Sequence, residues 1–379
     1  MAHLNSKLPA DEPEQLLIKS QENTNPNYGC EPEKRDIETH LQYGVINLDK
    51  PSGPTSHEVV TWVRKLLNIS NAGHGGTLDP KVTGVLPCAL GKATRVLAAL
   101  LTAGKEYVGV MYLHTPSALK ILMPDLVKIE AEPKNPELRS DFQEKWKMTP
   151  EEAQRLKISK KKLEKVFKIF TNEIYQRPPL KSSVARKLRI RKIHYCKLLE
   201  LNENRVLFII GCEAGTYIRK FCYDIGETLC AGAHMTDLRR TRVGKFTEKD
   251  NLITLQNLKD AFTIYQREGN DYYLRKIVYP MEKMVEHIPK IFVRDTAVDA
   301  LCHGADLAAA GVCFIDARIK PGMLIALMTL KKELIGFSIA KLNAMDIFKA
   351  KSGIMAKIKK VFMARNTYPR WDEKNSKKS

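Results

Sequence analysis

The 379-residue sequence predicts an α+β protein, with a larger domain of mixed helices and strands and a small β-rich domain at its C-terminal end. Two observations carry this prediction. Hydrophobic residues make up 44% of the chain, which is a globular share, and the length is sufficient for two cores. Helical and extended patterns alternate up to about residue 285, whereas residues 291–362 consist of short apolar runs divided by Gly and Asp.

The first elements follow from simple patterns. Residues 1–40 contain few periodic apolar positions and are expected to form an arm, and residues 43–49 are expected to form a buried strand. Two prolines and a glycine make residues 50–54 a loop. Thr55 precedes a helix, because Glu58 three positions later completes a capping box. Apolar residues then recur at helical spacing, at Val59, Val63, Leu66 and Leu67.

Further along, residues 73–76 form a glycine-rich loop that leads to the pair Asp79-Pro80. We expect a helix over residues 93–101 and a strand over residues 105–113. Residues 115–160 are mixed in charge and contain five prolines, so this segment is expected to be an insertion.

The second half of the larger domain begins with a helix predicted over residues 161–170. Residues 191–201 and 205–212 are separated by Asn202-Glu203-Asn204 and are expected to form a β-hairpin. The helix predicted after Gly215 places apolar residues on one face, at Ile218, Phe221, Cys222, Ile225 and Leu229.

The net charge of +19 is concentrated in two segments. Residues 155–197 carry +13 and residues 351–379 carry +7, which leaves −1 for the rest of the chain. A solvated helix face and a frayed basic tail would be the simplest explanation. In residues 186–192, however, cations alternate with apolar residues, which predicts an amphipathic strand with one cationic face. Because lipidation motifs and broad apolar helix faces are lacking, we favour nucleic acid over a membrane surface as the partner.

Several classes of site and protein are disfavoured. The eight cysteines include no C-x-x-C pair and the nine histidines show no metal-ligand spacing, so we expect neither a metal site nor a disulfide scaffold. The glycine-rich loop has Leu78 where a dinucleotide motif needs its third glycine. The first 40 residues are polar, so we do not expect a signal peptide, and the best apolar window, residues 84–103, contains Lys92 and Arg95. We therefore expect a soluble, cytoplasmic protein.

Asp79 is the first candidate for chemistry. It stands between a glycine-rich loop and a proline, which disfavours helical backbone there. An Asp-Pro turn with a capping carboxylate would explain the pattern without any chemistry. Alternatively, the glycines let a partner approach, and a carboxylate kept ionised by an arginine can act as a nucleophile or a base. Candidate arginines lie at residue 219 and among residues 238–242.

The order of several segments resembles the TruB family of pseudouridine synthases. These segments are GVINLDKPSGPTSHEVV, GHGGTLDPKVTGVLP, AGKEYVG, QRPPLKSSV, EAGTYIRKFCYDIG and AHMTDLRRTRVG. The pair Lys81-Val82, which follows Asp79-Pro80, resembles the dyskerin-type branch of this family. Members of that branch are the catalytic subunits of H/ACA ribonucleoproteins. The arm and the ending VFMARNTYPRW resemble archaeal members of that branch.

The resemblance implies an isomerase that turns uridine into pseudouridine without an external cofactor. Asp79 would be the catalytic aspartate and would attack C1′ of the sugar or remove a proton from C2′. Tyr107, otherwise an ordinary strand aromatic, would stack on the flipped uracil, and Arg219 would pair with Asp79. Tyr217 and Leu238 would line the pocket. His74 would contact the RNA around the target, while Lys50 and Pro51 would support the site from behind.

The resemblance also implies a domain plan. Residues 1–40 would be an arm that packs on the C-terminal domain, and residues 41–285 a catalytic domain with a mixed, mainly antiparallel sheet. Residues 286–371 would form a PUA domain that binds the lower stem and ACA end of a guide RNA, and residues 372–379 a basic tail. For the insertion at 115–160 we favour a surface loop over extended RNA contact.

The implied partners are an H/ACA guide RNA, a ribosomal RNA substrate, small Gar-type and Nop-type subunits and a kink-turn-binding ribosomal-type protein. Two other functions stay open at this point. A guide-independent enzyme acting on tRNA would share every catalytic residue, and a noncatalytic RNA-binding scaffold would share the fold.

Overall fold

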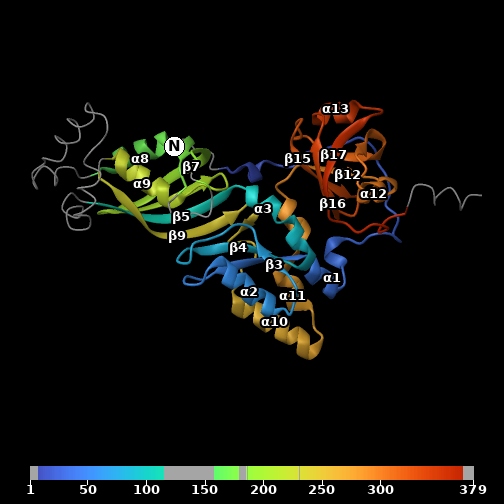
Figure 1. Ribbon diagram of the computed structural model, residues 1–379, viewed down its shortest axis with the longest axis horizontal. Coiled ribbons are helices and arrows are strands. Elements are labelled where there is room, and N and C mark those ends of the chain that lie inside the picture. Colours follow the sequence, from blue (N-terminus) through green and yellow to red (C-terminus); the bar gives the residue numbers. More distant parts are fainter. Residues whose placement is uncertain (1–6, 115–157, 179–184, 186, 230, 370–379) are drawn as a thin grey trace, which may run out of the picture. The chain divides into compact units, whose positions relative to one another are not determined.

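The computed structural model describes residues 7–114, 158–178, 185, 187–229 and 231–369. The chain divides into two compact units. Unit 1 consists mainly of the described residues of Gly104–Thr241, and unit 2 of Leu8–Ala103 together with the described residues of Arg242–Ser379. Each unit is coloured along the chain in Figure 1.

Unit 1 is built on a sheet with the strand order β9-β5-β8-β7-β6. The pairs β5·β8, β7·β8 and β6·β7 are antiparallel. The strands are β5 (Lys105–Leu113), β6 (Asn172–Gln176), β7 (Arg189–Asn202), β8 (Arg205–Cys212) and β9 (Ala233–Val243), the last of which ends in unit 2. β5 and the β7–β8 hairpin confirm the predicted strand and hairpin.

Two helices cover one face of this sheet, α8 (Lys160–Ile169) and α9 (Ile218–Thr228) (Figure 1). Phe167 of α8 and Phe221 of α9 contact Phe208 of β8, with ring centroids about 6 Å apart. The apolar face predicted for the helix after Gly215 faces the core, since Ile218, Cys222 and Ile225 are all buried. The core of unit 1 therefore lies between α8, α9 and the sheet.

Unit 2 contains an antiparallel group of strands in which β4 (Thr83–Leu90) pairs with β2 (Gly44–Lys50) and β3 (Ala72–His74). β11 (Val278–Pro280) extends it beside β2, and β10 (Phe246–Thr247) pairs with the last residues of β9. The helices of this part are α1 (Ile37–Gln42), α2 (Ser56–Leu66), α3 (Ala98–Thr102), α10 (Leu255–Glu268) and α11 (Tyr272–Ile277). α2 begins at the predicted capping box of Thr55 and Glu58.

The rest of unit 2 is a seven-stranded sheet, here called the C-terminal sheet, with the order β1-β14-β12-β15-β16-β17-β13. β12 and β15 run parallel, whereas the other neighbours are antiparallel. Its strands are β1 (Leu16–Ile18), β12 (Lys290–Val293), β13 (Leu307–Ala308), β14 (Val312–Asp316), β15 (Leu324–Thr329), β16 (Leu334–Ala340) and β17 (Ile354–Val361). Two helices accompany it, α12 (Asp295–Cys302) and α13 (Ala344–Lys349). Short 3-10 helices occur in unit 2 at Pro9–Asp11, Pro32–Lys34, Gly91–Val96, Met281–Val285 and Ala309–Gly311.

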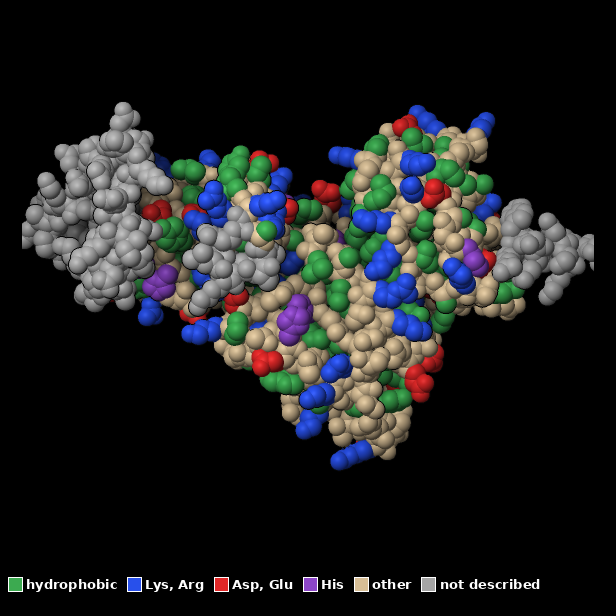
Figure 2. All heavy atoms as spheres, in the orientation of Figure 1, with side chains coloured by type: hydrophobic (Ala, Val, Ile, Leu, Met, Phe, Trp, Pro, Cys, Tyr) green, Lys and Arg blue, Asp and Glu red, His purple; other side chains and the backbone are tan. Residues whose placement is uncertain are grey.

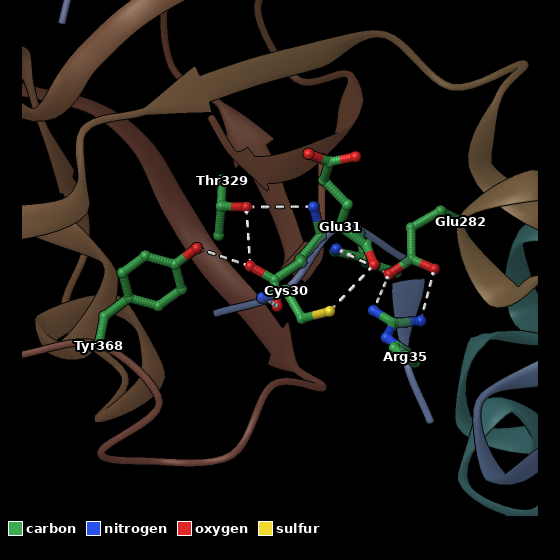
Figure 3. Close-up of polar contacts among 8 residues, drawn as sticks. Cys30, Glu31, Arg35, Glu282, Thr329 and Tyr368 are labelled. Atoms are coloured by element: carbon green, nitrogen blue, oxygen red, sulfur yellow. Dashed lines mark hydrogen bonds and ion pairs between the residues drawn. The ribbon is translucent and has the colours of Figure 1, made fainter. Parts of the chain in front are cut away.

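The N-terminal arm is bound to the C-terminal sheet by more than β1. The buried Glu333 carboxylate accepts hydrogen bonds from Tyr368 Oη at 2.6 Å and from the backbone N–H of Cys30 at 3.1 Å. Arg35 donates two hydrogen bonds to Glu282, at 3.0 and 2.8 Å. Figure 3 shows this pair together with Cys30 and Tyr368. Buried charge-assisted bonds of this kind fix the course of the arm.

One prediction differs from the structure, one lies almost entirely outside the described residues, and the fold class is confirmed. A single helix over residues 93–101 is wrong, because Gly91–Val96 is a 3-10 turn in which Thr94 Oγ1 donates to Gly91 O at 2.7 Å, and α3 starts only after it. The insertion at 115–160 lies almost entirely outside the described residues. Predicted α+β class and largely antiparallel sheets are confirmed. Among the described helices, none combines the length and hydropathy that crossing a bilayer requires.

Candidate functional site

The predicted site residues divide between the two units. Lys50, Pro51, His74 and Asp79 belong to unit 2, whereas Tyr107, Tyr217, Arg219 and Leu238 belong to unit 1. The residues of each set lie on loops, on strands or at the start of a helix.

Asp79 lies on the loop between β3 and β4. Its side chain is exposed, whereas its neighbour Leu78 and the later Val82 are buried. The N–H of Val82 donates to Asp79 O at 3.0 Å, and the N–H of Gly53 donates to Pro80 O at 3.0 Å. The loop thus presents a carboxylate to solvent from an anchored backbone.

Lys50 is the main anchor of this loop. Its side chain is fully buried, and Nζ donates to three backbone carbonyls, those of Pro51, Pro80 and Val82, each at 2.9 Å. A buried ammonium is costly unless each of its donors finds an acceptor, and these three acceptors match its three N–H groups. Lys50 therefore fixes the backbone on the C-terminal side of Asp79.

Ser56 fixes the other side, and the sequence analysis did not single it out. Its buried hydroxyl accepts from the N–H of Leu78 at 2.9 Å and donates to Leu78 O at 3.1 Å. Thr55 caps α2, so the hydroxyl of Ser56 is available for the loop. The sequence contained one signal for this role of Ser56: Thr and Ser are adjacent at the helix start, and only one of them is needed as the cap.

His74 ends β3, opposite Cys88 of β4. Its Nδ1 accepts from the N–H of Gly76 at 3.3 Å, and its ring meets His57 of α2 edge-on, with centroids 5.1 Å apart. Gly76 has a φ of +136°, a conformation that side chains strongly disfavour, so glycine is required at this turn. The half-buried His74 lies on the same loop connection as Asp79.

In unit 1, Tyr107 and Leu238 lie on one face of the sheet. Tyr107 is buried and alternates along β5 with half-buried residues. A Cβ at Gly109 would lie 3.0 Å from Leu238 Cδ1, so the leucine packs over this glycine, two residues along β5 from the tyrosine. The glycine leaves room for an apolar wall beside an aromatic ring.

Two buried cations share that face. Lys105 and Arg240 are two residues from Tyr107 and Leu238 respectively, and both are buried. Burial, together with the smaller effect of the positive charge of Arg240, lowers the pKa of Lys105 to about 8. The sequence analysis missed Lys105, because a lysine in a strand is normally assigned to the surface.

Tyr217 and Arg219 lie where α9 begins. Tyr217 occupies the N-cap position in extended backbone, and Arg219 is an exposed residue of the first turn. The buried Gln176 of β6 pairs with the main chain of Tyr217, accepting from its N–H at 3.0 Å and donating to its carbonyl at 3.2 Å. Gly215, with φ of +80°, lies against the guanidinium of Arg191.

The candidate arginines of residues 238–242 have different roles. Arg242 donates two hydrogen bonds to Asp11 of the arm, at 3.0 and 2.6 Å, and a third to Gly244 O. Arg240 is buried in the sheet beside Lys105. In the described part of the chain, no cluster of three or more His, Cys, Asp and Glu is placed to hold a metal ion.

Models of known families match most of the chain. The DKCLD (NUC011) domain matches residues 5–60, the N-terminal domain of TruB family pseudouridylate synthases residues 64–123 and 136–218, and the C-terminal domain of tRNA pseudouridylate synthase B residues 219–286. A PUA domain matches residues 289–362. Curated relatives agree. "Probable tRNA pseudouridine synthase B" of Pyrococcus furiosus is 47% identical over 370 residues, 97% of either chain, and that of Methanopyrus kandleri is 46% identical over 364 residues, 96% of this chain and 95% of the relative.

The chain belongs to the TruB family of pseudouridine synthases.

Solved structures extend this assignment. A chain of a Cbf5-Nop10-Gar1 complex matches with a TM-score of 0.81 and 47% identity, over 96% of this chain and 98% of that one. A chain of an H/ACA RNP bound to a substrate RNA containing 2'-deoxyuridine matches with a TM-score of 0.80 and 45% identity. The match covers 96% of this chain and 99% of that one. The resemblance found in the sequence is confirmed.

The TruB-family chain carries exposed cations in both basic segments. On α8 the exposed lysines are Lys160, Lys161, Lys162, Lys165 and Lys168, and at the end of the C-terminal sheet the exposed cations are Lys351, Lys357, Lys359, Lys360 and Arg365. Figure 2 shows lysine and arginine side chains on the surface of both units. Exposed cations in a folded framework suit phosphate contacts.

Proposed function

We propose that this TruB-family enzyme isomerises uridine to pseudouridine in ribosomal RNA, directed by an H/ACA guide RNA. The observation that carries the proposal is the similarity, at 45–47% identity over about the whole chain, to chains from Cbf5-Nop10-Gar1 and H/ACA RNP structures. Small Gar-type and Nop-type subunits and a kink-turn-binding protein would complete the assembly, in the cytoplasm.

The chemistry proposed for Asp79 begins with its exposed carboxylate on an anchored loop. It would attack C1′ or take a proton from C2′, after which the freed uracil turns and rejoins through C5. A carboxylate suits a sugar carbon with oxocarbenium character. Lys50 and Ser56 hold the loop from both sides, so that the carboxylate keeps one position while the base is released.

The residues proposed for the base-binding wall come from the family resemblance. Tyr107 would stack on the flipped uracil, and Leu238 and Tyr217 would line the pocket. Arg219 would pair with Asp79 and keep it ionised, and His74 would contact the flanking RNA. Flipping the uridine costs a few kcal/mol, which stacking and pocket contacts recover.

Release of tritium from RNA labelled at C5 of uridine tests the proposal, since the C5 hydrogen leaves during isomerisation. The assay is run with and without guide RNA and accessory proteins. Turnover that requires both supports the proposal. Because the curated relatives carry the name tRNA pseudouridine synthase B, tRNA is the second substrate, and equal turnover on tRNA without a guide would favour a guide-independent enzyme. No release under any condition would leave an RNA-binding scaffold.

A further inference from the structure

Gln176 is a buried polar residue that the reaction described above does not use. It is the last residue of β6, and its side chain is 1% exposed. Its amide makes two hydrogen bonds, and both go to the main chain of one residue, Tyr217. The sequence separation is 41 residues, so this contact joins two distant segments of unit 1.

The contact gives hydrogen-bond partners to both the N–H and the carbonyl of Tyr217, the residue at which α9 begins. Tyr217 O also accepts from the N–H of Phe221 at 3.0 Å, which is the first hydrogen bond of the helix. The side chain of Tyr217 makes no cap hydrogen bond to the helix, so the N-cap geometry depends on its backbone partners. Gln176 therefore sets the position of the residue at which the helix starts.

The placement of two predicted pocket residues depends on the position of this helix start. Tyr217 is the contacted residue itself, and Arg219 lies in the first turn. The loop before them is restrained separately, by Thr216 Oγ1 donating to Glu213 O at 2.7 Å and by Arg191 packed against Gly215. A small rotation at Tyr217 would turn both side chains together, without unfolding the helix behind them.

We propose that Gln176 is a positioning residue for catalysis, which orients Tyr217 and Arg219 through the paired amide–main-chain contact. This inference rests on the proposed function. A neutral amide fits because the site needs one donor and one acceptor in the same plane. A carboxylate can accept from the N–H of Tyr217 but repels its carbonyl, whereas a protonated carboxyl group can again donate and accept.

The test compares Gln176→Glu and Gln176→Met in the complete guide-RNA complex, by single-turnover tritium release at pH values from about 5 to about 8.5. Near pH 8 both variants should be slower than wild type by about tenfold to a hundredfold, since a hydrogen-bond partner of a buried group is lost. As the pH falls, Q176E should recover relative to wild type, because burial raises the pKa of its carboxyl group above the ordinary value of about 4.3. Q176M should stay slow throughout.

Gln256→Glu is the matched control, because Gln256 also donates a side-chain hydrogen bond, to Asp260, but on the exposed face of α10. Its pH profile should follow wild type. Hydrogen exchange of the Tyr217 amide gives a readout that does not depend on turnover. Exchange should be faster in Q176M than in wild type at each pH.

The outcomes are distinct. Recovery of Q176E but not Q176M at low pH, with unchanged guide-RNA binding, supports the positioning role. Equal profiles for the two variants, a wild-type rate for Q176E at pH 8, or losses that follow guide-RNA binding and melting temperature would each overturn it. A wild-type complex that releases no tritium would instead contradict the proposed function, while amide exchange would still report on the Gln176 contact.

Discussion

The loop of Asp79 and the loop of Tyr217 are both held by a buried polar side chain, but the two side chains differ in their hydrogen-bonding groups. Lys50 donates to three carbonyls around Asp79, whereas Gln176 donates once and accepts once at Tyr217. The backbone explains the choice. Pro51 and Pro80 contribute carbonyls but no N–H groups, so their loop needs a side chain that only donates.

The comparison implies that the anchors are separable from the chemistry. Anchors should affect both stability and activity, whereas an exposed reactive group should affect activity alone. The following substitutions examine that distinction, from the largest expected effect to the smallest.

Asp79→Asn should reduce tritium release by more than about a thousandfold, since the amide can neither attack the sugar nor take its proton. Because the side chain is exposed, the free energy of unfolding should change by less than about 0.5 kcal/mol. Guide-RNA binding should be nearly unchanged. Asp260→Asn on α10 is the control, and near-normal turnover by D79N would show that the catalytic group has been misassigned.

Lys50→Met should lower the free energy of unfolding by about 3 kcal/mol, because three backbone carbonyls lose the donor that a buried side chain gives them. Activity should fall as well, because the loop loses its fixed course. Denaturant unfolding measures the effect against Lys81→Met, an exposed lysine of the same loop. Equal stability of the two variants would refute the role of Lys50 as an anchor.

Ser56→Ala should cost about 1–2 kcal/mol, since Leu78 loses the partner of both its N–H and its carbonyl. Ser52→Ala is the natural comparison, because Ser52 is exposed and makes one long hydrogen bond of 3.4 Å to the same loop. The anchor role requires S56A to be clearly less stable than S52A in thermal unfolding.

Asp11→Asn should have the smallest effect, and the effect should depend on pH. Burial alone would raise the pKa of Asp11, but hydrogen bonds from Arg242 and the N–H of Leu8 outweigh it and lower the pKa. The folded carboxyl group therefore holds its proton less tightly than the unfolded one, so its stabilisation is full above the unfolded pKa and is lost as the pH falls through the lower, folded value. Melting temperatures of D11N and wild type should differ at pH 7 and converge below about pH 4. A constant difference would contradict this linkage.

Local patterns predicted the elements whose cause is local. The capping box of Thr55 and Glu58 begins α2, and residues 105–113 form the predicted strand β5. The central basic run was predicted to be a strand with one cationic face. In the structure Leu188 and Ile190 are 56% and 49% exposed, while Arg191 is half-buried against Gly215.

The orientation of the side chains in the central basic run could not be predicted from local sequence. Arg191 packs against Gly215, which lies in a loop more distant in the sequence. The same limit applies to the anchors. Composition assigns lysine and glutamine to the surface, and only the fold shows that Lys50 meets proline carbonyls and that Gln176 meets an N-cap. The roles of Asp79, Tyr107 and Arg219 stay predictions from the family resemblance.

The pairing of β1 with β14 has a consequence for how the protein is made. Leu16 pairs with Asp316, so the edge strand of the C-terminal sheet leaves the ribosome about 300 residues before its partner. At ordinary rates of synthesis this interval is about 15–60 s. During that time the arm has no sheet to join, and Leu16 and Ile18 stay available to other chains. Completion of the sheet is therefore a late event in biogenesis, and a strand that is synthesised long before its partner is among the last to fold.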